Sequence, residues 1–135
     1  MVTLSDVEAA RARIRDAVYQ TPCAHSVTLS RLLGCELYLK LENLQMTGAF
    51  KERGARNRLL LLTDDERRRG VITASAGNHG QALAYHAGKL GVRAVVVMPE
   101  GTPLVKIDST RGHGAEVVLA GGSFDDAVAR AHELR

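Results

Sequence analysis

Cysteine, tryptophan and long apolar runs are scarce in this sequence. The chain has no tryptophan and two cysteines, Cys23 and Cys35, which stand apart and form no CxxC pair. Neither a disulfide framework nor a metal site is indicated, so we expect two reduced thiols and no bound metal. No apolar stretch reaches the length of a membrane span, and residues 1–20 lack the apolar core of a signal peptide. These absences predict a cytoplasmic protein with no membrane contact.

The common nucleotide-binding motifs are missing as well. Neither GxGxxG nor GxxxxGK[ST] occurs, which disfavours a dinucleotide or nucleoside-triphosphate site. The net charge is +3, but the one tight basic run, Arg67–Arg69, follows the acidic run Asp64–Glu66, as is typical of a solvated helix face. Aromatic residues make up only 4% of the chain, so base stacking has little support. A nucleic-acid-binding domain is a second hypothesis, which salt-dependent binding would test.

What the sequence does contain is typical of one globular domain. Its 135 residues are 45% apolar and 24% charged. In the first half, Ser5 and Glu8 form a capping-box pattern for a helix whose apolar repeat runs through Ile14 and Val18 to Thr21–Pro22. The alternating segment 35–42 predicts a strand with one buried face. Two further helices are predicted, at Phe50–Leu62 and between a Thr63/Glu66 cap and Gly70.

From residue 71 the pattern becomes a repeat of strand, loop and helix. Val-rich strands are predicted at 71–74, 93–98 and 115–119, and helices follow at 78–90, at 104–111 and from Ser123 to the end. Continuous apolar strands between helices indicate an α/β fold with a parallel sheet flanked by helices. Such sheets bind ligands at the carboxyl ends of their strands.

The turn after the first of these strands, SAGNHG at 75–80, is therefore the candidate site. Ser75, Gly77 and Asn78 place N–H groups, a hydroxyl and an amide at a helix N-terminus, which favours a bound carboxylate or phosphate. The alternative is structural, because Ser and Asn are common N-caps and Gly often serves only the backbone.

Two stretches together carry a family resemblance. KLENLQMTGAFKERGA (40–55) and ASAGNHGQA (74–82) resemble the pyridoxal-phosphate enzymes of the tryptophan-synthase-β fold, and among them the threonine dehydratases, or threonine ammonia-lyases. The family pattern is Lys-x-Glu-x-x-Gln-x-x-Gly-Ser/Ala-Phe-Lys-x-Arg-Gly, then Ser-Ser/Ala-Gly-Asn-His, and each position is filled. The resemblance continues through 96–127. It implies pyridoxal 5'-phosphate as cofactor and deamination of L-threonine, or L-serine, to a 2-oxo acid and ammonia.

The resemblance also implies residue roles. Lys51 is similar to the lysine that forms the Schiff base, Phe50 to the ring that packs on the pyridine, and Asn78 to the amide that binds the ring hydroxyl. The implied grip on the substrate carboxylate consists of Ser75, Gly77, Asn78 and His79. Glu42 and Gln45 are expected to stabilise the loop before Lys51. Without the motif, the expectation for Lys51 is a solvated cation paired with Glu52.

Alternatives within the resemblance concern the reaction and the extent of the protein. Ala76 stands where the similar serine racemases carry a second serine, which favours elimination over racemisation; a β-replacement synthase and a non-catalytic, anion-binding remnant are further alternatives. The family's glycine-rich phosphate loop has no counterpart here, and GGS at 121–123 is not expected to replace it. The resemblance implies the N-terminal part of a homo-oligomeric enzyme: residues 1–49 from a large cofactor domain and 50–135 from a small α/β domain, incomplete.

Overall fold

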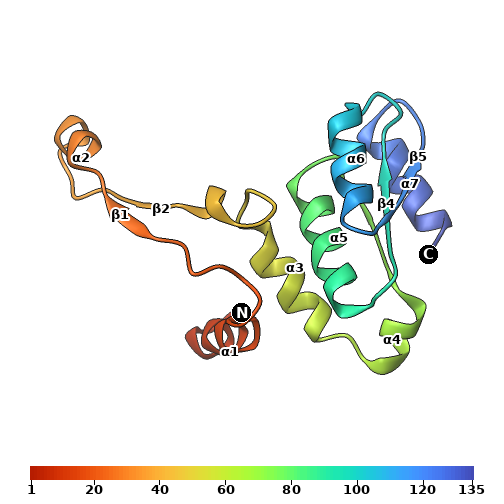
Figure 1. Cartoon of the computed structure of the whole chain (residues 1–135), viewed down its shortest axis with the longest axis horizontal. Coiled ribbons are helices and arrows are strands. Elements are labelled where there is room, and N and C mark those ends of the chain that lie inside the picture. Colours follow the sequence, from red (N-terminus) through yellow and green to blue (C-terminus); the bar gives the residue numbers. More distant parts are fainter.

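A three-stranded parallel sheet lies at the centre of the computed structural model, which describes residues 1–135 (Figure 1). Its strands are β3 (Val71–Ala74), β4 (Ala94–Met98) and β5 (Glu116–Leu119), in the spatial order β3-β4-β5. The register aligns Val71 with Ala94 and Val95 with Glu116. Every residue of β4 is buried, because helices cover both faces of the sheet. The predicted α/β fold with a parallel sheet is confirmed.

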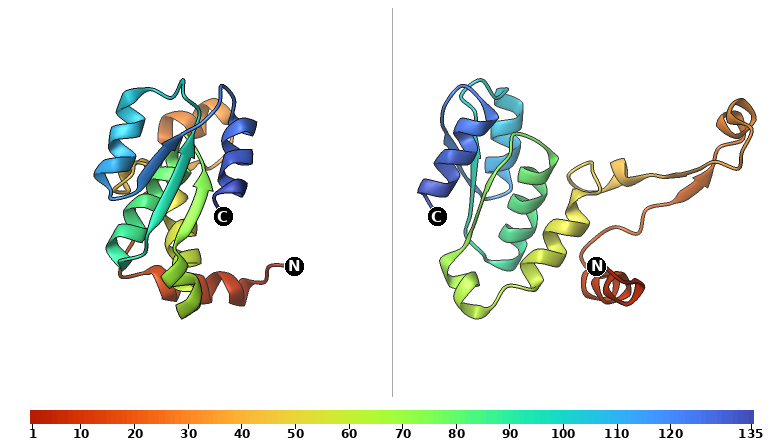
Figure 2. Two further views of the ribbon diagram at one scale, coloured as in Figure 1. Left: turned by 90° about the vertical axis from the view of Figure 1, so that its right-hand side faces the viewer. Right: turned by 180° about the vertical axis from the view of Figure 1, so that it is seen from behind.

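Three helices cover the sheet. α5 (Asn78–Leu90) and α6 (Leu104–Gly112) lie on one face, and α7 (Phe124–Glu133) lies on the other, as the left view of Figure 2 shows. Alternate side chains of β4 supply the two cores: Val96 and Met98 pack toward α5 and α6, and Val95 and Val97 toward α7. The predicted helices are confirmed, including the Ser123 cap.

Two more helices precede the sheet. α3 (Lys51–Leu60) packs beside α5 on the side away from the sheet, and its fully buried Leu59 joins the core there. α4 (Asp64–Arg69) begins with the predicted capping box between Thr63 and Glu66. It ends at Gly70, whose φ of 87° is accessible to glycine at little cost. Both predictions are confirmed to within two residues.

The first helix differs from its prediction. α1 (Leu4–Ile14) is capped by Thr3, whose hydroxyl accepts the Asp6 N–H while the Asp6 carboxylate accepts the Thr3 N–H. The prediction of a Ser5/Glu8 cap is wrong because Thr3 and Asp6 form the capping box two residues earlier in the chain. The helix also ends seven residues before Thr21, and Ile14 is its only buried residue. An amphipathic face that packs at one position does not stabilise further turns.

The segment between α1 and α3 forms an arm that extends from the rest of the molecule (Figures 1 and 2). It consists of β1 (Cys23–His25), α2 (Val27–Leu33), β2 (Tyr38–Lys40) and the 3₁₀ helix η1 (Glu42–Leu44). β1 and β2 pair antiparallel, and all their residues are exposed. The predicted strand at 35–42 is therefore too long, and its buried face is wrong, because no second layer covers the ribbon. No helix of the chain is both long and apolar enough to cross a membrane.

Candidate functional site

The loop between β3 and α5 forms the first part of the candidate site. Ser75 is buried, and its hydroxyl oxygen accepts hydrogen bonds from the backbone N–H groups of Gly77 at 3.3 Å and Gly80 at 3.0 Å. The N–H groups of Asn78 and His79, at the start of α5, have no acceptor within the chain. Two free donors at the positive end of a helix dipole favour an anion. The loop thus combines the capping role of Ser75 with two free backbone donors, here called the anion cradle, that suit a negatively charged group.

The start of α3 forms the second part. Lys51 is its first residue and is exposed, and the Lys51 amine lies 5.0 Å from the centroid of the Phe50 ring. That ring is itself 59% exposed, so an amine and an aromatic face stand together at the surface. Because α3 and α5 pack side by side, the two parts of the site are neighbours (Figure 1).

His79 connects these two parts electrostatically. Its partial burial lowers the pKa of the imidazole below the ordinary 6.5, and the positive charge of Lys51 lowers it further. The ring is therefore neutral at pH 7, with one nitrogen as donor and the other as acceptor. Lys51 thus lies close enough to His79 for its charge to act on the imidazole.

Not every predicted site residue is equally available. Asn78 and His79 are exposed at the start of α5 with free N–H groups, whereas the Gly77 N–H is already bonded to Ser75. Ser75 uses its oxygen as an acceptor, which leaves only its hydroxyl hydrogen to donate. Within the chain, the cradle therefore consists mainly of Asn78 and His79.

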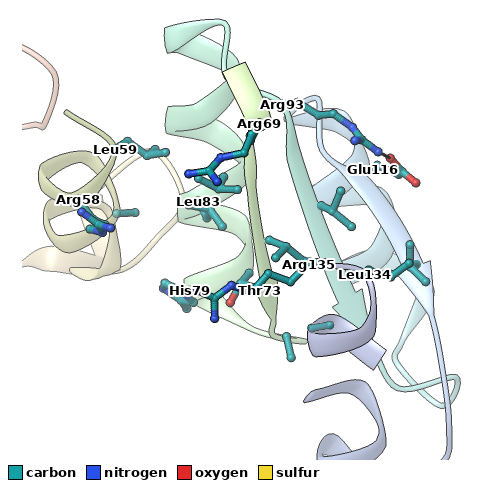
Figure 3. Close-up of a pocket in the computed structure, with 18 of the residues that line it drawn as sticks. Arg58, Leu59, Arg69, Thr73, His79, Leu83, Arg93, Glu116, Leu134 and Arg135 are labelled. Carbon is teal, nitrogen blue, oxygen red and sulfur yellow. Dashed lines mark hydrogen bonds and ion pairs between the residues drawn. The ribbon is translucent and has the colours of Figure 1, made fainter. Parts of the chain in front are cut away.

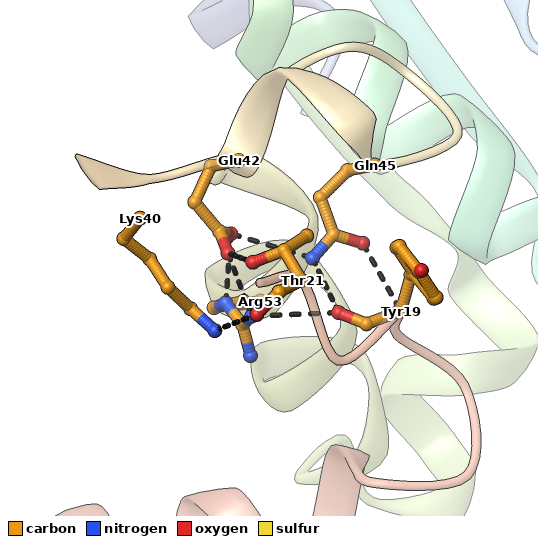
Figure 4. Close-up of polar contacts among 6 residues, drawn as sticks. All are labelled: Tyr19, Thr21, Lys40, Glu42, Gln45 and Arg53. Atoms are coloured by element: carbon orange, nitrogen blue, oxygen red, sulfur yellow. Dashed lines mark hydrogen bonds and ion pairs between the residues drawn. The ribbon is translucent and has the colours of Figure 1, made fainter. Parts of the chain in front are cut away.

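A network of polar contacts supports the loop before Lys51 (Figure 4). Arg53, on the first turn of α3, donates to both carboxylate oxygens of Glu42, at 2.8 Å and 2.7 Å. The Thr21 hydroxyl donates to the same carboxylate at 2.6 Å, and the Gln45 amide exchanges two hydrogen bonds with the backbone of Tyr19. The predicted loop-stabilising role of Glu42 and Gln45 is confirmed. Arg53, which holds the Glu42 carboxylate, was given no role in the sequence analysis.

This network predicts acid sensitivity. The hydrogen bonds from Arg53, with those from Thr21 and Gln45, lower the pKa of Glu42 from its ordinary 4.5 to about 2. Since the folded pKa lies below the unfolded one, the stabilisation is complete above pH 4.5 and is lost as pH falls toward 2. We expect Glu42→Gln to lower the free energy of unfolding at pH 7 by about 2–3 kcal/mol.

Urea denaturation at several pH values checks this prediction. The difference between wild type and Glu42→Gln should shrink steadily from pH 4.5 to pH 2. Glu8→Gln, on the exposed face of α1, is the control and should match wild type throughout. A constant difference between wild type and Glu42→Gln down to pH 2 contradicts the assigned ionisation.

Sequence reasoning missed the role of Glu52. It follows Lys51 directly and was considered only as a surface partner for that lysine in the absence of the motif, but its side chain is fully buried. Its carboxylate contacts Thr47 and His86 instead. Nothing in the sequence signals this, because the position lies between a lysine and an arginine. The alternative interpretation of Lys51 as a surface cation paired with Glu52 is therefore not supported.

A cavity of about 880 Å³ runs along the outer edge of β3 (Figure 3). β3 is an edge strand, so this side of its backbone has no strand partner in the chain. α3 flanks the cavity on one side and α7 on the other, and Arg58, Arg69 and Arg135 are among the residues that line it. His79 is the one predicted site residue in the lining. The cavity therefore meets the candidate site at His79 only.

Comparisons with known proteins agree with this arrangement. A family model described as "Pyridoxal-phosphate dependent enzyme" matches residues 14–135. L-threonine ammonia-lyase of Thermotoga maritima is 48% identical over 135 residues, which are 100% of this chain and 34% of that protein.

Solved structures extend the similarity to the fold. Serine racemase from Dictyostelium discoideum has a TM-score of 0.91 at 41% identity, over 98% of this chain and 43% of that one. The processed form of threonine deaminase isoform 2 from Solanum lycopersicum has a TM-score of 0.86 at 38% identity, over 98% and 38%. The chain thus spans less than half the length of each of these proteins.

Proposed function

Because the chain belongs to the family of pyridoxal-phosphate dependent enzymes, we propose that it carries the amino-acid-binding part of a threonine ammonia-lyase, with Lys51 as the Schiff-base lysine. L-threonine would yield 2-oxobutanoate and ammonia, since the water lost in elimination returns when the released product is hydrolysed. L-serine would yield pyruvate in the same way. The observation that carries the proposal is the exposed Lys51 amine over the Phe50 ring, beside the start of α5.

The side chains of the site fit the cofactor in part. Lys51 offers a primary amine for an aldehyde, the exposed Phe50 ring offers an apolar face for a pyridine, and the Asn78 amide offers a donor and an acceptor for a ring hydroxyl. The turn at 121–123 does not serve the phosphate, because the Asp126 carboxylate accepts the N–H groups of Gly122 and Ser123. The phosphate contacts would have to come from outside these residues.

The chain's own residues act by positioning and by proton transfer. When bound, pyridoxal phosphate supplies an aldehyde for amines and a ring that accepts electrons released at the α-carbon. The free N–H groups of Asn78 and His79 would hold the substrate carboxylate and so orient the α-carbon toward Lys51. The Lys51 amine would accept the α-proton of the substrate.

The reaction class is also a proposal, because a serine racemase and a threonine deaminase both have this fold. Ala76 favours elimination. Its methyl group packs against the apolar core on the α5 side and provides no hydroxyl for a second proton transfer. Chiral analysis of serine after incubation separates the two activities: pyruvate without D-serine supports the lyase, and D-serine in excess of pyruvate supports the racemase.

We also propose the division of the protein. Residues 1–49, including the exposed arm, would belong to a large cofactor domain and residues 50–135 to a small α/β domain, in a cytoplasmic homo-oligomer. Exposed apolar side chains on the arm support this division, since α2 contains no buried residue.

Covalent trapping tests the proposed function. The chain is incubated with pyridoxal phosphate and reduced with borohydride, and the modified lysine is identified by mass spectrometry. We expect the label at Lys51 in preference to Lys40, Lys89 and Lys106, the other three lysines. Even labelling of all four lysines would argue against a cofactor site in this chain.

A further inference from the structure

Glu52 is the second residue of α3, yet its side chain is completely buried. Carboxylates are rarely buried unless they have partners. One oxygen, Oε1, accepts hydrogen bonds from the backbone N–H of Thr47 and, at 2.9 Å, from the Thr47 hydroxyl. The other, Oε2, lies 3.3 Å from Nε2 of His86, and both side chains are 1% exposed. These three residues form a buried polar cluster beneath the start of α3.

The contact with Thr47 closes the segment that leads into Lys51. Between Thr47 and Glu52 the chain passes through Gly48, whose φ of 71° is in the left-handed region, and then through Phe50 and Lys51. A carboxylate that reaches back five residues fixes both ends of this short loop. The backbone of Lys51 therefore has little freedom while Glu52 holds Thr47.

The contact with His86 joins two helices. His86 lies on α5, about two turns beyond Asn78 and His79, and Glu52 lies on the first turn of α3. The remaining contact between these helices is largely apolar, through Leu59 and Leu83. Apolar contacts tolerate small shifts, whereas Glu52 Oε2 and His86 Nε2 form a close polar contact without hydrogen-bond geometry and have no other partner, so separating them would leave both atoms buried and unpaired. The polar pair thus sets the position of α3 along α5.

The charges around the pair are compatible with this role. Burial lowers the pKa of His86, the nearby Arg56 lowers it further, and Glu52 opposes both effects. The Tyr85 ring meets the His86 ring edge-on, with ring centroids 4.9 Å apart. A neutral imidazole carries one N–H, and its Nε2–H tautomer is the one that can serve Glu52. A buried polar pair contributes little net stability compared with apolar side chains, which favours a role in specificity.

We propose that the Glu52–His86 pair is a positioning device for Lys51, which holds the Lys51 amine at a fixed place relative to the start of α5. The inference rests on the proposed function of Lys51. Glu52 and His86 are positioning residues, since both are buried and act through Thr47 and the two helices. The pair would thereby hold the Lys51 amine at a fixed distance from a substrate whose carboxylate is bound by the free N–H groups of α5.

Three variants of the chain test the proposal. Glu52→Leu removes both contacts, Glu52→Gln keeps an oxygen for Thr47, and Leu59→Ala weakens the packing of α3 without touching the cluster. Two properties are measured in each: the rate of borohydride trapping at Lys51, and the pKa of the His79 ring by NMR titration. The pKa of His79 depends on the Lys51 charge and can be measured without the cofactor.

In Glu52→Leu we expect trapping at Lys51 to slow at least about tenfold, because small misplacements of reacting groups are costly. The pKa of His79 should rise toward its ordinary value as Lys51 moves away. The loss of the Glu52 charge cannot mimic this rise, since removing a negative charge lowers a histidine pKa. Glu52→Gln should retain most of the trapping rate, and Leu59→Ala should melt at a lower temperature while both properties stay at wild-type values.

Unchanged trapping and an unchanged His79 titration in Glu52→Leu overturn the proposal. The proposal is also overturned if Leu59→Ala slows trapping at Lys51 as much as Glu52→Leu does, because the pair would then act only through the stability of the fold. If wild type shows no preference for Lys51, the proposed function fails, and the His79 titration alone decides whether the pair positions Lys51.

Discussion

Replacing Lys51 by alanine is expected to abolish both cofactor attachment and the release of 2-oxobutanoate from L-threonine. The side chain supplies the proposed amine for the cofactor aldehyde and the proposed acceptor for the α-proton. Acid–base catalysis alone contributes about 10²–10⁴-fold. With attachment lost as well, turnover should fall by at least about 10³-fold. It is measured with pyridoxal phosphate in this chain and in any longer polypeptide that carries it.

The same substitution should leave the fold intact. Lys51 is exposed, and its amine lies over the exposed Phe50 ring, so the free energy of unfolding should change by less than about 0.5 kcal/mol. Lys106→Ala, on the exposed side of α6, is the matched control and should keep full turnover. Normal turnover by Lys51→Ala, with Lys106→Ala equally active, would remove Lys51 from the mechanism.

The part of the fold that was predictable from sequence is the sheet whose two faces are both covered by helices. In β4, five consecutive apolar residues occur because helices cover both faces, and the flanking glycines and caps define each helix. The arm has no such constraint. The alternation around Tyr38 and Leu39 describes a pleat, but burial of one face requires a second layer, and the chain provides none.

The site divides in a similar way. Lys51, Asn78 and His79 could be proposed from motifs, because the proposed cofactor chemistry would require those side chains at those places. Glu52 and His86 could not, because their proposed role depends on a contact between two residues that are 34 positions apart in the sequence, on different helices. A buried carboxylate beside a lysine has the same local pattern as a surface ion pair. Only the packing of α3 on α5 distinguishes the two.

Substituting Gly80 by alanine is expected to damage both stability and the site loop. A Cβ at Gly80 would lie 2.8 Å from the Ser75 carbonyl oxygen and 3.0 Å from Cγ1 of Val96. Neither neighbour can yield easily, since the first is backbone and the second is fully buried in β4. Overpacking of this kind costs about 1–3 kcal/mol, and the gain in helix propensity of about 1 kcal/mol offsets part of it.

We therefore expect Gly80→Ala to lose up to about 2 kcal/mol of stability, or up to roughly 7 °C in melting temperature. Because α5 must move away from Ser75, the hydrogen bond from the Gly80 N–H to the Ser75 hydroxyl lengthens and the anion cradle shifts. The KM for L-threonine should rise as a result. Gly54→Ala in α3 is the matched control: its Cβ meets nothing within 4 Å, so it should gain up to about 1 kcal/mol. Equal stabilisation of both variants would show that α5 does not depend on its close approach to Ser75.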